Sequence, residues 1–186
     1  WATSRDHSIT IIDPTLVKAP PNVIVTQAIE ELSNQRFDII VIAIKPQLIE
    51  QVLPAYRGFL SDTGCFISIV AGYSVASIEK LIGEQAIMRV MPNLARQIGR
   101  SVSALYANSR CSLAQIETAT ALNNAVGYTH IVNSEDELDR VTTLAGSGSG
   151  YAFEITRCSI DSAIEVGFSL PTARELVLNT QGGSIE

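Results

Sequence analysis

The sequence predicts an α/β fold in which a doubly wound, mostly parallel sheet is followed by an all-helical part. Short β-branched runs alternate with helical patterns over the first two thirds of the 186 residues, which is the order of a parallel sheet with right-handed crossover helices. One run, 38–44, is apolar on both faces, as in a central strand that helices cover on both sides. After about residue 133 only helical periodicity remains. We therefore expect two domains, 1–133 and 134–186.

Short apolar segments of the first domain carry the strand pattern. They are residues 9–13, 23–25, 38–44, 65–70 and 86–91. The first is a β-branched run that ends at Pro14, and the run 65–70 repeats the doubly apolar pattern of 38–44. Runs of this length, bounded by turn residues, are typical of buried strands.

Helices are expected between these strands. One follows Pro46, because proline is favoured in the first helical turn, where its missing N–H costs little. A second follows Ser74. A third begins at Ser112, which forms a capping box with Gln115 three residues later.

The second domain is expected to consist of helices alone. Ser134 and Glu137 form a further capping box at its start. A helix over 151–165 is predicted to end at Gly167, and another runs from 170 to about 180.

Between the capping box and that helix lies the run Leu144-Ala145-Gly146-Ser147-Gly148-Ser149-Gly150. Small residues placed immediately before a helix leave its first N–H groups accessible, so we expect a helix entrance that can hold an anion. The alternative is a flexible link between two packed units.

Composition excludes several classes of function. The formal net charge is -6, and no Lys/Arg-rich run offers the cations that a nucleic-acid surface needs. No apolar run reaches the roughly 18 residues of a membrane span. Cys65, Cys111 and Cys158 lack metal-ligand or disulfide spacing, so we expect reduced core thiols in a cytoplasmic protein, with no metal site. Both ends read as cut, since residues 1–4 resemble the end of a helix.

Ligands of a parallel sheet gather beyond the carboxyl ends of its strands. Asp13 follows the first strand, and its carboxylate could bind an adenosine ribose, although an Asp-Pro turn, taken by itself, explains the residue slightly better. Lys45 follows the third strand, either over the strand ends or as a solvated cation. Small residues at 70–72 could let a planar ring approach, or pack against a helix. Asn93 could hold a carboxamide or a substrate oxygen, or serve as a turn residue.

Four motifs in order and spacing resemble pyrroline-5-carboxylate reductases over residues 9–180. They are Ala43-Ile44-Lys45-Pro46-Gln47, residues 68–72, Arg89-Val90-Met91-Pro92-Asn93, and Asp139-x-Val141-Thr142-x-Leu144-x-Gly146-Ser147-Gly148. The resemblance implies a Rossmann-type NAD(P)-binding domain and a helical dimerisation domain. It also implies reduction of 1-pyrroline-5-carboxylate to L-proline, the last step of proline biosynthesis, by a homodimer or higher homo-oligomer.

The resemblance also assigns roles to residues. It implies cofactor contacts at Asp13, Thr15, Ala43, Ile44, Lys45, Pro46, Ala71 and Asn93. It implies substrate contacts at Glu135, Ser147, Gly148 and Ser149, with Glu135, aligned after a one-residue shift, facing the ring nitrogen and Ser147 positioning the substrate. The cofactor is NAD or NADP. Asp13 should repel a 2′-phosphate and favour NAD, unless Lys18 offsets it. The strand ends and the serine-bearing segment should then converge on one cleft.

The chain departs from the family pattern in two places. Leu94-Ala95 replaces Thr-Pro and Ser149-Gly150 replaces Pro-Ala, which should loosen two loops. The family's glycine-rich loop is expected before Trp1 and a Gly-Gly-Thr-Thr loop after Glu186, so the chain by itself is expected to be an incomplete reductase.

Two other functions remain open at this point. A related dehydrogenase acting on another small acid should need a lysine base in the helical domain, and no lysine follows Lys80. A non-catalytic or regulatory NAD(P)-binding protein is the other alternative, which the two departures favour.

Overall fold

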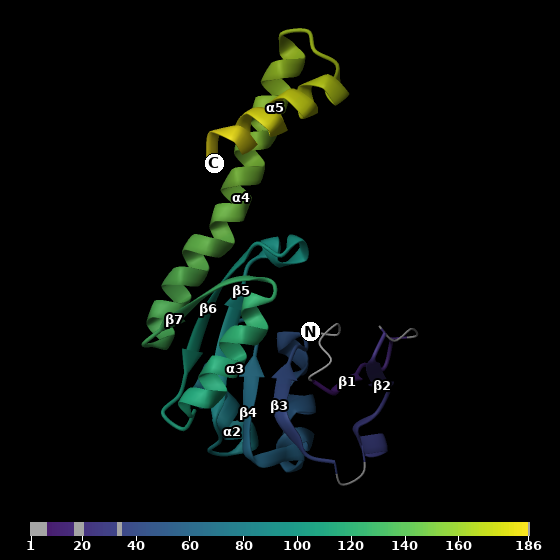
Figure 1. Ribbon diagram of the computed structural model, residues 1–186, viewed down its shortest axis with the longest axis vertical. Helices are drawn as coiled ribbons and strands as arrows, with labels where there is room; N and C mark the ends of the chain where they lie inside the picture. The colour runs from purple at the N-terminus through teal and green to yellow at the C-terminus, as the bar shows by residue number, and fades with distance from the viewer. Residues whose placement is uncertain (1–6, 17–20, 33–34, 186) are drawn as a thin grey trace.

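The structure is a computed structural model that describes residues 7–16, 21–32 and 35–185. An α/β part carries one long helix, α4 (Glu135–Glu165), which rises from it, and α5 (Leu170–Ile185) folds back toward it (Figure 1). Lys18 and the expected helix end at residues 1–4 lie outside the described residues. No described helix combines the length and apolar character that a membrane crossing requires.

The main sheet has five strands in the order β3-β4-β5-β6-β7. Their bounds are Phe37–Ile42 for β3, Leu60–Ser68 for β4, Ile87–Pro92 for β5, Ser101–Ala107 for β6 and Gly127–Val132 for β7. Only the β5–β6 pair is antiparallel. A separate parallel pair consists of β1 (Ile9–Ile12) and β2 (Val23–Thr26). The predicted α/β class, with a mostly parallel sheet, is confirmed.

The sequence prediction omitted β6 and β7. These strands contain Gly, Ser, Ala and His, so neither shows the continuous apolar run by which the other strands were recognised. Their pairing depends on close backbone approach. Gly127 has φ 149°, and a Cβ at this position would overlap the backbone of Ser101 on the neighbouring strand. Ser101 and Ser103 are buried and hydrogen-bond each other through their hydroxyls.

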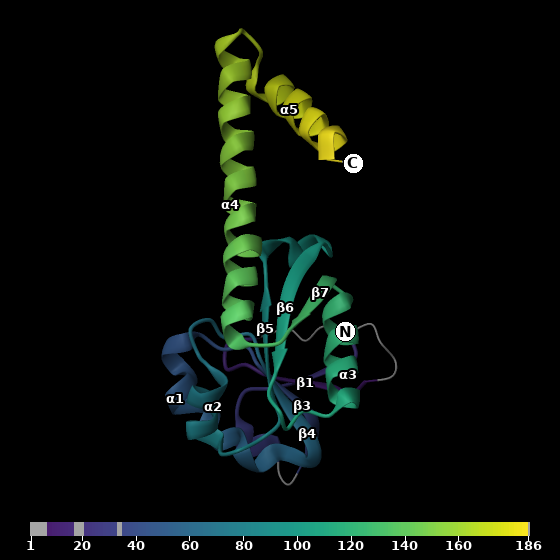
Figure 2. The ribbon, with the colours of Figure 1, turned by 90° about the vertical axis from the view of Figure 1, so that its left-hand side faces the viewer.

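Helices cover both faces of the sheet, as the doubly apolar strands require. Figure 2 shows α1 (Ile49–Val52) and α2 (Val75–Ile82) on one side and α3 (Leu113–Asn124) on the other. Alternate residues of β4 supply the two cores, with Phe66 packing toward α2 and Ile67 toward α3. Both side chains are almost completely buried, so this strand joins the two hydrophobic layers.

The predicted helix starts are largely confirmed. The Ser74 hydroxyl accepts a hydrogen bond from the amide of Ser77, and the capping box of Ser112 and Gln115 makes both of its bonds. For the helix after Pro46, the predicted α-helical type is wrong. It is divided into η2 (Pro46–Leu48), α1 and η3 (Leu53–Phe59), so most of it is 3-10 helix. Two further 3-10 segments are η1 (Ile29–Leu32) and η4 (Leu94–Ile98).

The prediction that a helix begins just after residues 144–150 is wrong. This run lies in the middle of α4, which begins at Ser134, whose hydroxyl accepts from the amide of Glu137. The Glu137 carboxylate accepts from the amide of Asn133 instead of closing the box on Ser134. Tertiary packing of α4 on β5, β6 and η4 outweighs the roughly 1 kcal/mol that each interior glycine costs a helix. The amides of the run are therefore inside a helix.

The end of α4 follows the prediction. The helix ends at Glu165, with Val166 as its C-cap and Gly167 at φ 104°, a backbone angle that glycine adopts readily. The next helix begins at Leu170 as expected but continues to Ile185, beyond the predicted end.

The cysteines are free, but they differ in environment. Cys65 is buried, and burial raises the pKa of its thiol to about 12. Cys111 is half-buried, and burial also raises its pKa. Cys158 is exposed on α4, so the expectation of a core thiol is wrong there, because this part of α4 extends beyond the sheet.

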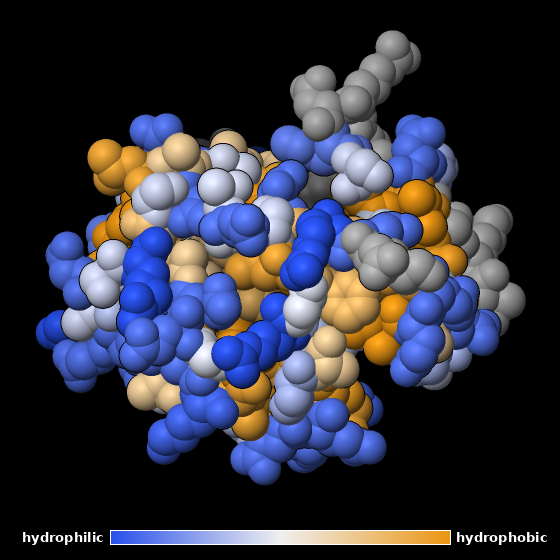
Figure 3. Space-filling view, turned by 90° about the horizontal axis from the view of Figure 1, so that it is seen from below, coloured by the Kyte–Doolittle hydropathy of each residue, from blue (hydrophilic) through white to orange (hydrophobic). Residues whose placement is uncertain are grey.

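Seen from below, the α/β part shows hydrophilic side chains with hydrophobic patches between them (Figure 3). α4 begins beside the sheet, next to β7, and runs upward, away from this end (Figure 1). The site described next is built where α4 meets the strands.

Candidate active site

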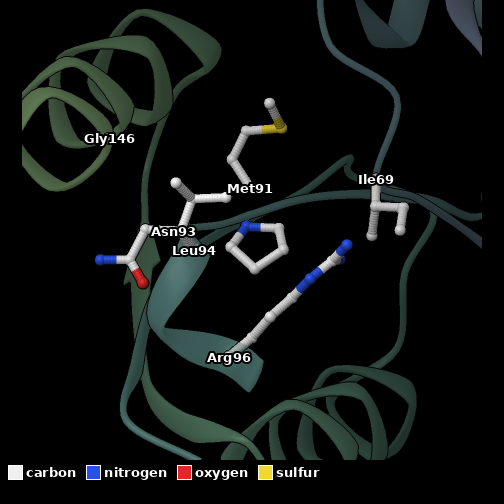
Figure 4. A pocket seen from close by; sticks show the side chains of 7 residues that line it. Ile69, Met91, Asn93, Leu94, Arg96 and Gly146 are labelled. Carbon is white, nitrogen blue, oxygen red and sulfur yellow. The ribbon is translucent and has the colours of Figure 1, made fainter. Parts of the chain in front are cut away.

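A pocket of about 300 Å³ lies where the carboxyl ends of β4 and β5 meet α4 (Figure 4). The residues that line it are Ile69, Met91, Pro92, Asn93, Leu94, Arg96 and Gly146. They come from the ends of two strands, from η4 and from the middle of α4. Ligands of open α/β sheets bind beyond the carboxyl ends of strands, and this pocket has that position.

Asn93 organises the wall of the pocket. Its side-chain oxygen accepts hydrogen bonds from the amides of Ala95 (3.3 Å) and Val102 (3.2 Å). Its Nδ2 donates to the carbonyl of Ala145 on α4 (3.2 Å). The sequence predicted that this carboxamide holds a ligand group. In the structure it joins η4 to β6 and links both of these elements to α4.

The loop that follows Asn93 is ordered by hydrogen bonds in place of the missing proline. Asn93 is the N-cap of η4, and Gly99 closes this segment in the left-handed conformation, with φ 71°. The amide of Arg96 donates to the carbonyl of Asn93 (3.3 Å). Ser149 and Gly150, the other departure, lie within α4 and form no loop. The expected loosening of two loops is thus wrong for the second and is countered by capping in the first.

The serine-bearing segment of α4 lies beside this pocket. Gly146 lines the pocket and Ala145 accepts the bond from Asn93. Ser149 shares their helical face, since residues three and four apart are neighbours on a helix, and it is half-buried, as is Gly148. Ser147 is exposed. The predicted convergence holds for the end of β5 and α4, whereas Lys45 is not among the pocket-lining residues.

Five other predicted cofactor residues follow β3 and β4 of the main sheet. Ala43, Lys45 and Ala71 are exposed, and Ile44 and Pro46 are half-buried. Lys45 is the N-cap of η2, and its carbonyl accepts from the amide of Leu48 (2.9 Å).

Asp13 and Thr15 form a compact turn after β1. The Asp13 carboxylate accepts from the amide (2.8 Å) and the hydroxyl (2.7 Å) of Thr15. The hydrogen bond from the Thr15 amide contributes most, and that from the Thr15 hydroxyl second, to lowering the pKa of Asp13 below its usual range. The side chain therefore carries its negative charge at neutral pH.

Glu135 is engaged within the protein. Its Oε1 accepts from Arg89 Nη1 (2.5 Å) and from the amide of Val75 at the start of α2 (3.0 Å). The Arg89 side chain is 7% exposed and that of Glu135 is 28% exposed. Asp139 lies 3.8 Å from the other guanidinium nitrogen. This cluster joins the first turns of α4 to β5 and α2.

The position of Glu135 separates two of the predicted substrate contacts. Because Glu135 and Ser147 lie on one continuous helix, the rise per residue separates their Cα atoms by roughly 18 Å. One small substrate in one chain cannot contact both. The resemblance assigned both residues to the substrate, and the predicted helix start after the glycine run did not reveal that they lie on one helix.

Arg96 is a pocket residue that the sequence prediction missed. It lies three residues after Asn93 and lines the pocket from η4. A cation close behind a predicted strand end was the available signal, but at this strand end only Leu94 and Ala95 were singled out, as departures from the family pattern.

Comparison with known proteins agrees with this architecture. Residues 135–186 match the family model described as pyrroline-5-carboxylate reductase dimerisation. The curated pyrroline-5-carboxylate reductase of Pseudomonas aeruginosa is 35% identical over 80% of this chain and 55% of its own length. That of Mycobacterium tuberculosis (strain H37Rv) is 34% identical over 88% and 57%. The chain thus spans little more than half the length of these curated relatives.

Solved structures give the same result. The pyrroline-5-carboxylate reductase of Coxiella burnetii superimposes with a TM-score of 0.79 at 31% identity, covering 88% of this chain and 61% of that one. The Plasmodium falciparum pyrroline carboxylate reductase, solved with NADP bound, gives a TM-score of 0.82 at 27% identity, covering 95% and 66%. With sequence and fold in agreement over most of its length, the chain belongs to the pyrroline-5-carboxylate reductase family.

Proposed function

We propose that the complete protein reduces 1-pyrroline-5-carboxylate to L-proline with NAD(P)H, the last step of proline biosynthesis. Family membership supports this reaction. The observation that carries the proposal is the pocket at the carboxyl ends of β4 and β5, closed on one side by α4. Its volume of about 300 Å³ suits a small ring, at the lower end of the range for ligand pockets.

The residues at the strand ends fit a dinucleotide. Asp13 holds a charged carboxylate after β1, where a ribose hydroxyl could bind, and Ala43 and Ala71 are small and exposed. Gly72 has φ 78° and open space where a Cβ would be, so a ligand can approach the backbone. The proposed cofactor contacts are Asp13, Thr15, Ala43, Ile44, Lys45, Pro46, Ala71 and Asn93. NADP in the Plasmodium falciparum relative supports this class of cofactor.

The bound nicotinamide would supply the hydride, and the protein would contribute orientation and shielding from water. Met91, Pro92 and Ile69 give the pocket apolar walls, which strengthen electrostatic interactions by excluding water. Ser147, Gly148 and Ser149 are proposed to face the substrate from α4. Glu135 is left out of the proposed substrate contacts because its Oε1 already accepts from Arg89 and from the amide of Val75.

A second copy of the chain is the proposed partner of the helical part. Large hydrophobic side chains are exposed there, namely Leu144, Tyr151, Phe153, Ile155, Leu176 and Leu178. Exposed apolar area on this scale is typical of association surfaces. The match of residues 135–186 to a dimerisation domain supports a homodimer or higher homo-oligomer.

An activity assay tests the proposed reaction. The complete protein should oxidise NADH or NADPH, followed at 340 nm, only when 1-pyrroline-5-carboxylate is present, and mass spectrometry should detect proline. Cofactor binding without substrate-dependent oxidation would contradict the proposal and favour a regulatory NAD(P)-binding protein. Turnover of another small acid in its place would favour a related dehydrogenase.

Cofactor preference provides a separate prediction. The Asp13 carboxylate should repel the 2′-phosphate of NADPH, so NADH should bind more tightly, and Asp13→Asn should improve NADPH binding roughly tenfold. Because the pKa of Asp13 is lowered, the preference should persist to about pH 5. Dissociation constants from fluorescence titration provide the measurement.

The control is Asp62→Asn, which removes an exposed carboxylate from β4 and should leave both affinities unchanged. A clear preference of the unmodified protein for NADPH would refute the assignment of Asp13.

A further inference from the structure

One stretch of α4 is uncharged although much of it is exposed to solvent. Residues 141–153 contain no Asp, Glu, Lys or Arg, and within this stretch Leu144 is 78% and Tyr151 is 69% exposed. The solvent face of a helix is normally rich in charged side chains. An exposed apolar surface of this kind is typical of an association site.

Leu144 and Tyr151 lie on the flank of α4 that faces away from the pocket. An α-helix turns by about 100° per residue, so Leu144 is about 160° around the helix from Gly146, which lines the pocket. Tyr151 follows Leu144 by seven residues, which is about two turns, so it lies on the same flank. This flank is therefore separate from the candidate active site.

The edge strand β7 presents Tyr128 at the level of this flank. Asn93 joins Ala145 of α4 to Val102 of β6, and Val102 is paired with Tyr128. Neighbouring strands are about 4.8 Å apart, so Tyr128 lies one such step beyond Val102. β7 is the last strand in the order of the main sheet, which places Tyr128 at the edge of the sheet beside α4.

Tyr128 and His130 are on the face of β7 that is turned toward α4. Alternate side chains of a strand share a face, and Val132 of the same series packs with Leu138 of α4 in one hydrophobic cluster. The rings of Tyr128 and His130 lie together, with their centroids 6.4 Å apart. Both side chains are exposed, that of Tyr128 to 62%, and β7 contains no Asp, Glu, Lys or Arg. The uncharged surface of α4 thus continues onto the sheet.

We infer that a helix of a second copy of this chain packs in the corner between α4 and β7, so that Tyr128 and His130 belong to the association surface. The inference rests on the proposed homo-oligomer and extends its surface beyond the helical part. Packed helices lie about 8–10 Å apart, which is about two strand spacings. A helix that packs beside α4 on the flank of Leu144 therefore lies over β7.

A second copy is the occupant because the corner is continuous with the dimerisation segment. Residues 135–186 match the dimerisation domain of the family, and α4, which begins this segment, starts at Glu135, directly after the loop that follows β7. The exposed leucines of α5, Leu176 and Leu178, give a second copy an apolar surface of matching chemistry. The second copy then contacts both the helical and the α/β part of the chain.

The test uses the complete protein and measures association directly. Tyr128→Glu places a charge in the corner, Leu144→Glu does the same on the α4 side, and Tyr128→Phe keeps the apolar ring. The matched control is Leu113→Glu, because Leu113 is 79% exposed at the start of α3, on the other face of the sheet (Figure 2). Sedimentation velocity over a dilution series in mild urea measures the dissociation constant of the oligomer. Far-UV circular dichroism confirms that each variant is folded.

We expect Tyr128→Glu and Leu144→Glu each to raise the dissociation constant at least about tenfold, because a charge without a partner opposes burial. Tyr128→Phe should stay within about threefold, since it retains the apolar ring. Leu113→Glu should stay within about twofold, since it changes an exposed position outside the corner.

A photo-crosslink tests the contact without a disruptive change. The aromatic photo-crosslinker p-benzoylphenylalanine replaces Tyr128 in one preparation and Leu113 in another. Each is exchanged in mild urea with a copy labelled with heavy isotopes, so that mass spectrometry separates crosslinks between copies from crosslinks within one copy. From position 128 we expect crosslinks between copies, to peptides of residues 135–186, and from position 113 we expect none.

Equal dissociation constants for Tyr128→Glu and Leu113→Glu would overturn the inference, as would the absence of crosslinks between copies from position 128. Failure of the proposed homo-oligomer looks different. An unmodified protein that sediments as a monomer at every concentration refutes the oligomer and the inference together. An oligomer that Leu144→Glu weakens and Tyr128→Glu does not is confined to the helical part, which refutes the inference and supports the oligomer.

Discussion

Replacing Glu135 with alanine should lower the free energy of unfolding by about 3 kcal/mol. Removing one partner of a mostly buried ion pair leaves the other charge uncompensated, at a cost of about 3–5 kcal/mol. We expect the lower end, because Glu135 is 28% exposed and Asp139 lies 3.8 Å from the same guanidinium. Arg89, with its side chain 7% exposed, is the group left without its main partner. Urea denaturation followed by circular dichroism provides the measurement.

A surface pair on the same helix provides the control. Asp136→Ala removes the ion pair between Asp136, whose side chain is 82% exposed, and Arg140, whose side chain is 73% exposed. This change should lower the free energy of unfolding by less than about 1 kcal/mol. The double variant Glu135→Leu with Arg89→Met should recover much of the loss, because two apolar groups replace the pair. Equal effects of Glu135→Ala and Asp136→Ala would show that the cluster does not anchor α4.

Replacing Asn93 with alanine should reduce kcat/KM roughly 100-fold and lower the free energy of unfolding by about 2 kcal/mol. The amides of Ala95 and Val102 lose their acceptor, at about 1–3 kcal/mol for each amide that water does not reach. Ala145 loses its donor, so α4 is free to shift against the strand ends. A displacement of about 1 Å in a positioned site can cost 100-fold in rate. Steady-state kinetics and urea denaturation of the complete protein measure the two effects.

Asn93→Asp separates the two tasks of this side chain. The carboxylate still accepts from both backbone amides, but it faces the carbonyl of Ala145 without a proton to donate. Stability should therefore stay within about 1 kcal/mol of the unmodified protein, while kcat/KM falls nearly as far as in Asn93→Ala. Unchanged kinetics in Asn93→Asp would show that the bond to Ala145 does not position α4.

The strands that the sequence predicted are those whose burial follows from composition alone. The runs that became β3 and β4 are apolar on both faces, so only a sheet with helices on each side can bury them. The strands β6 and β7 were missed because their fit depends on small residues, as at Gly127, where the backbone of Ser101 leaves no room for a side chain. Close packing of this kind has no hydrophobic period that a sequence pattern could reveal.

The candidate site was predictable where strand ends define it. Asn93 and the glycine-serine run were singled out in advance, and the structure brings Asn93 and Gly146 to one pocket. The predicted task of Asn93 was different, because the sequence does not reveal that β6 and α4 would occupy its carboxamide. Arg96 was overlooked for the same reason, since its place in the wall of the pocket is visible only once its neighbours are known.

The amino-acid sequence alone determined the α/β class, five of the strands, the helix starts at Ser74 and Ser112, and the family. Hydrophobic periodicity, capping side chains and motif spacing are local properties, and each can be recognised from residues close together in the chain. Only the tertiary structure decided that residues 144–150 continue α4, that Glu135 pairs with Arg89, and that Arg96 lines a pocket. These features depend on contacts between distant residues, whose packing overrides local preference and assigns each charge its partner.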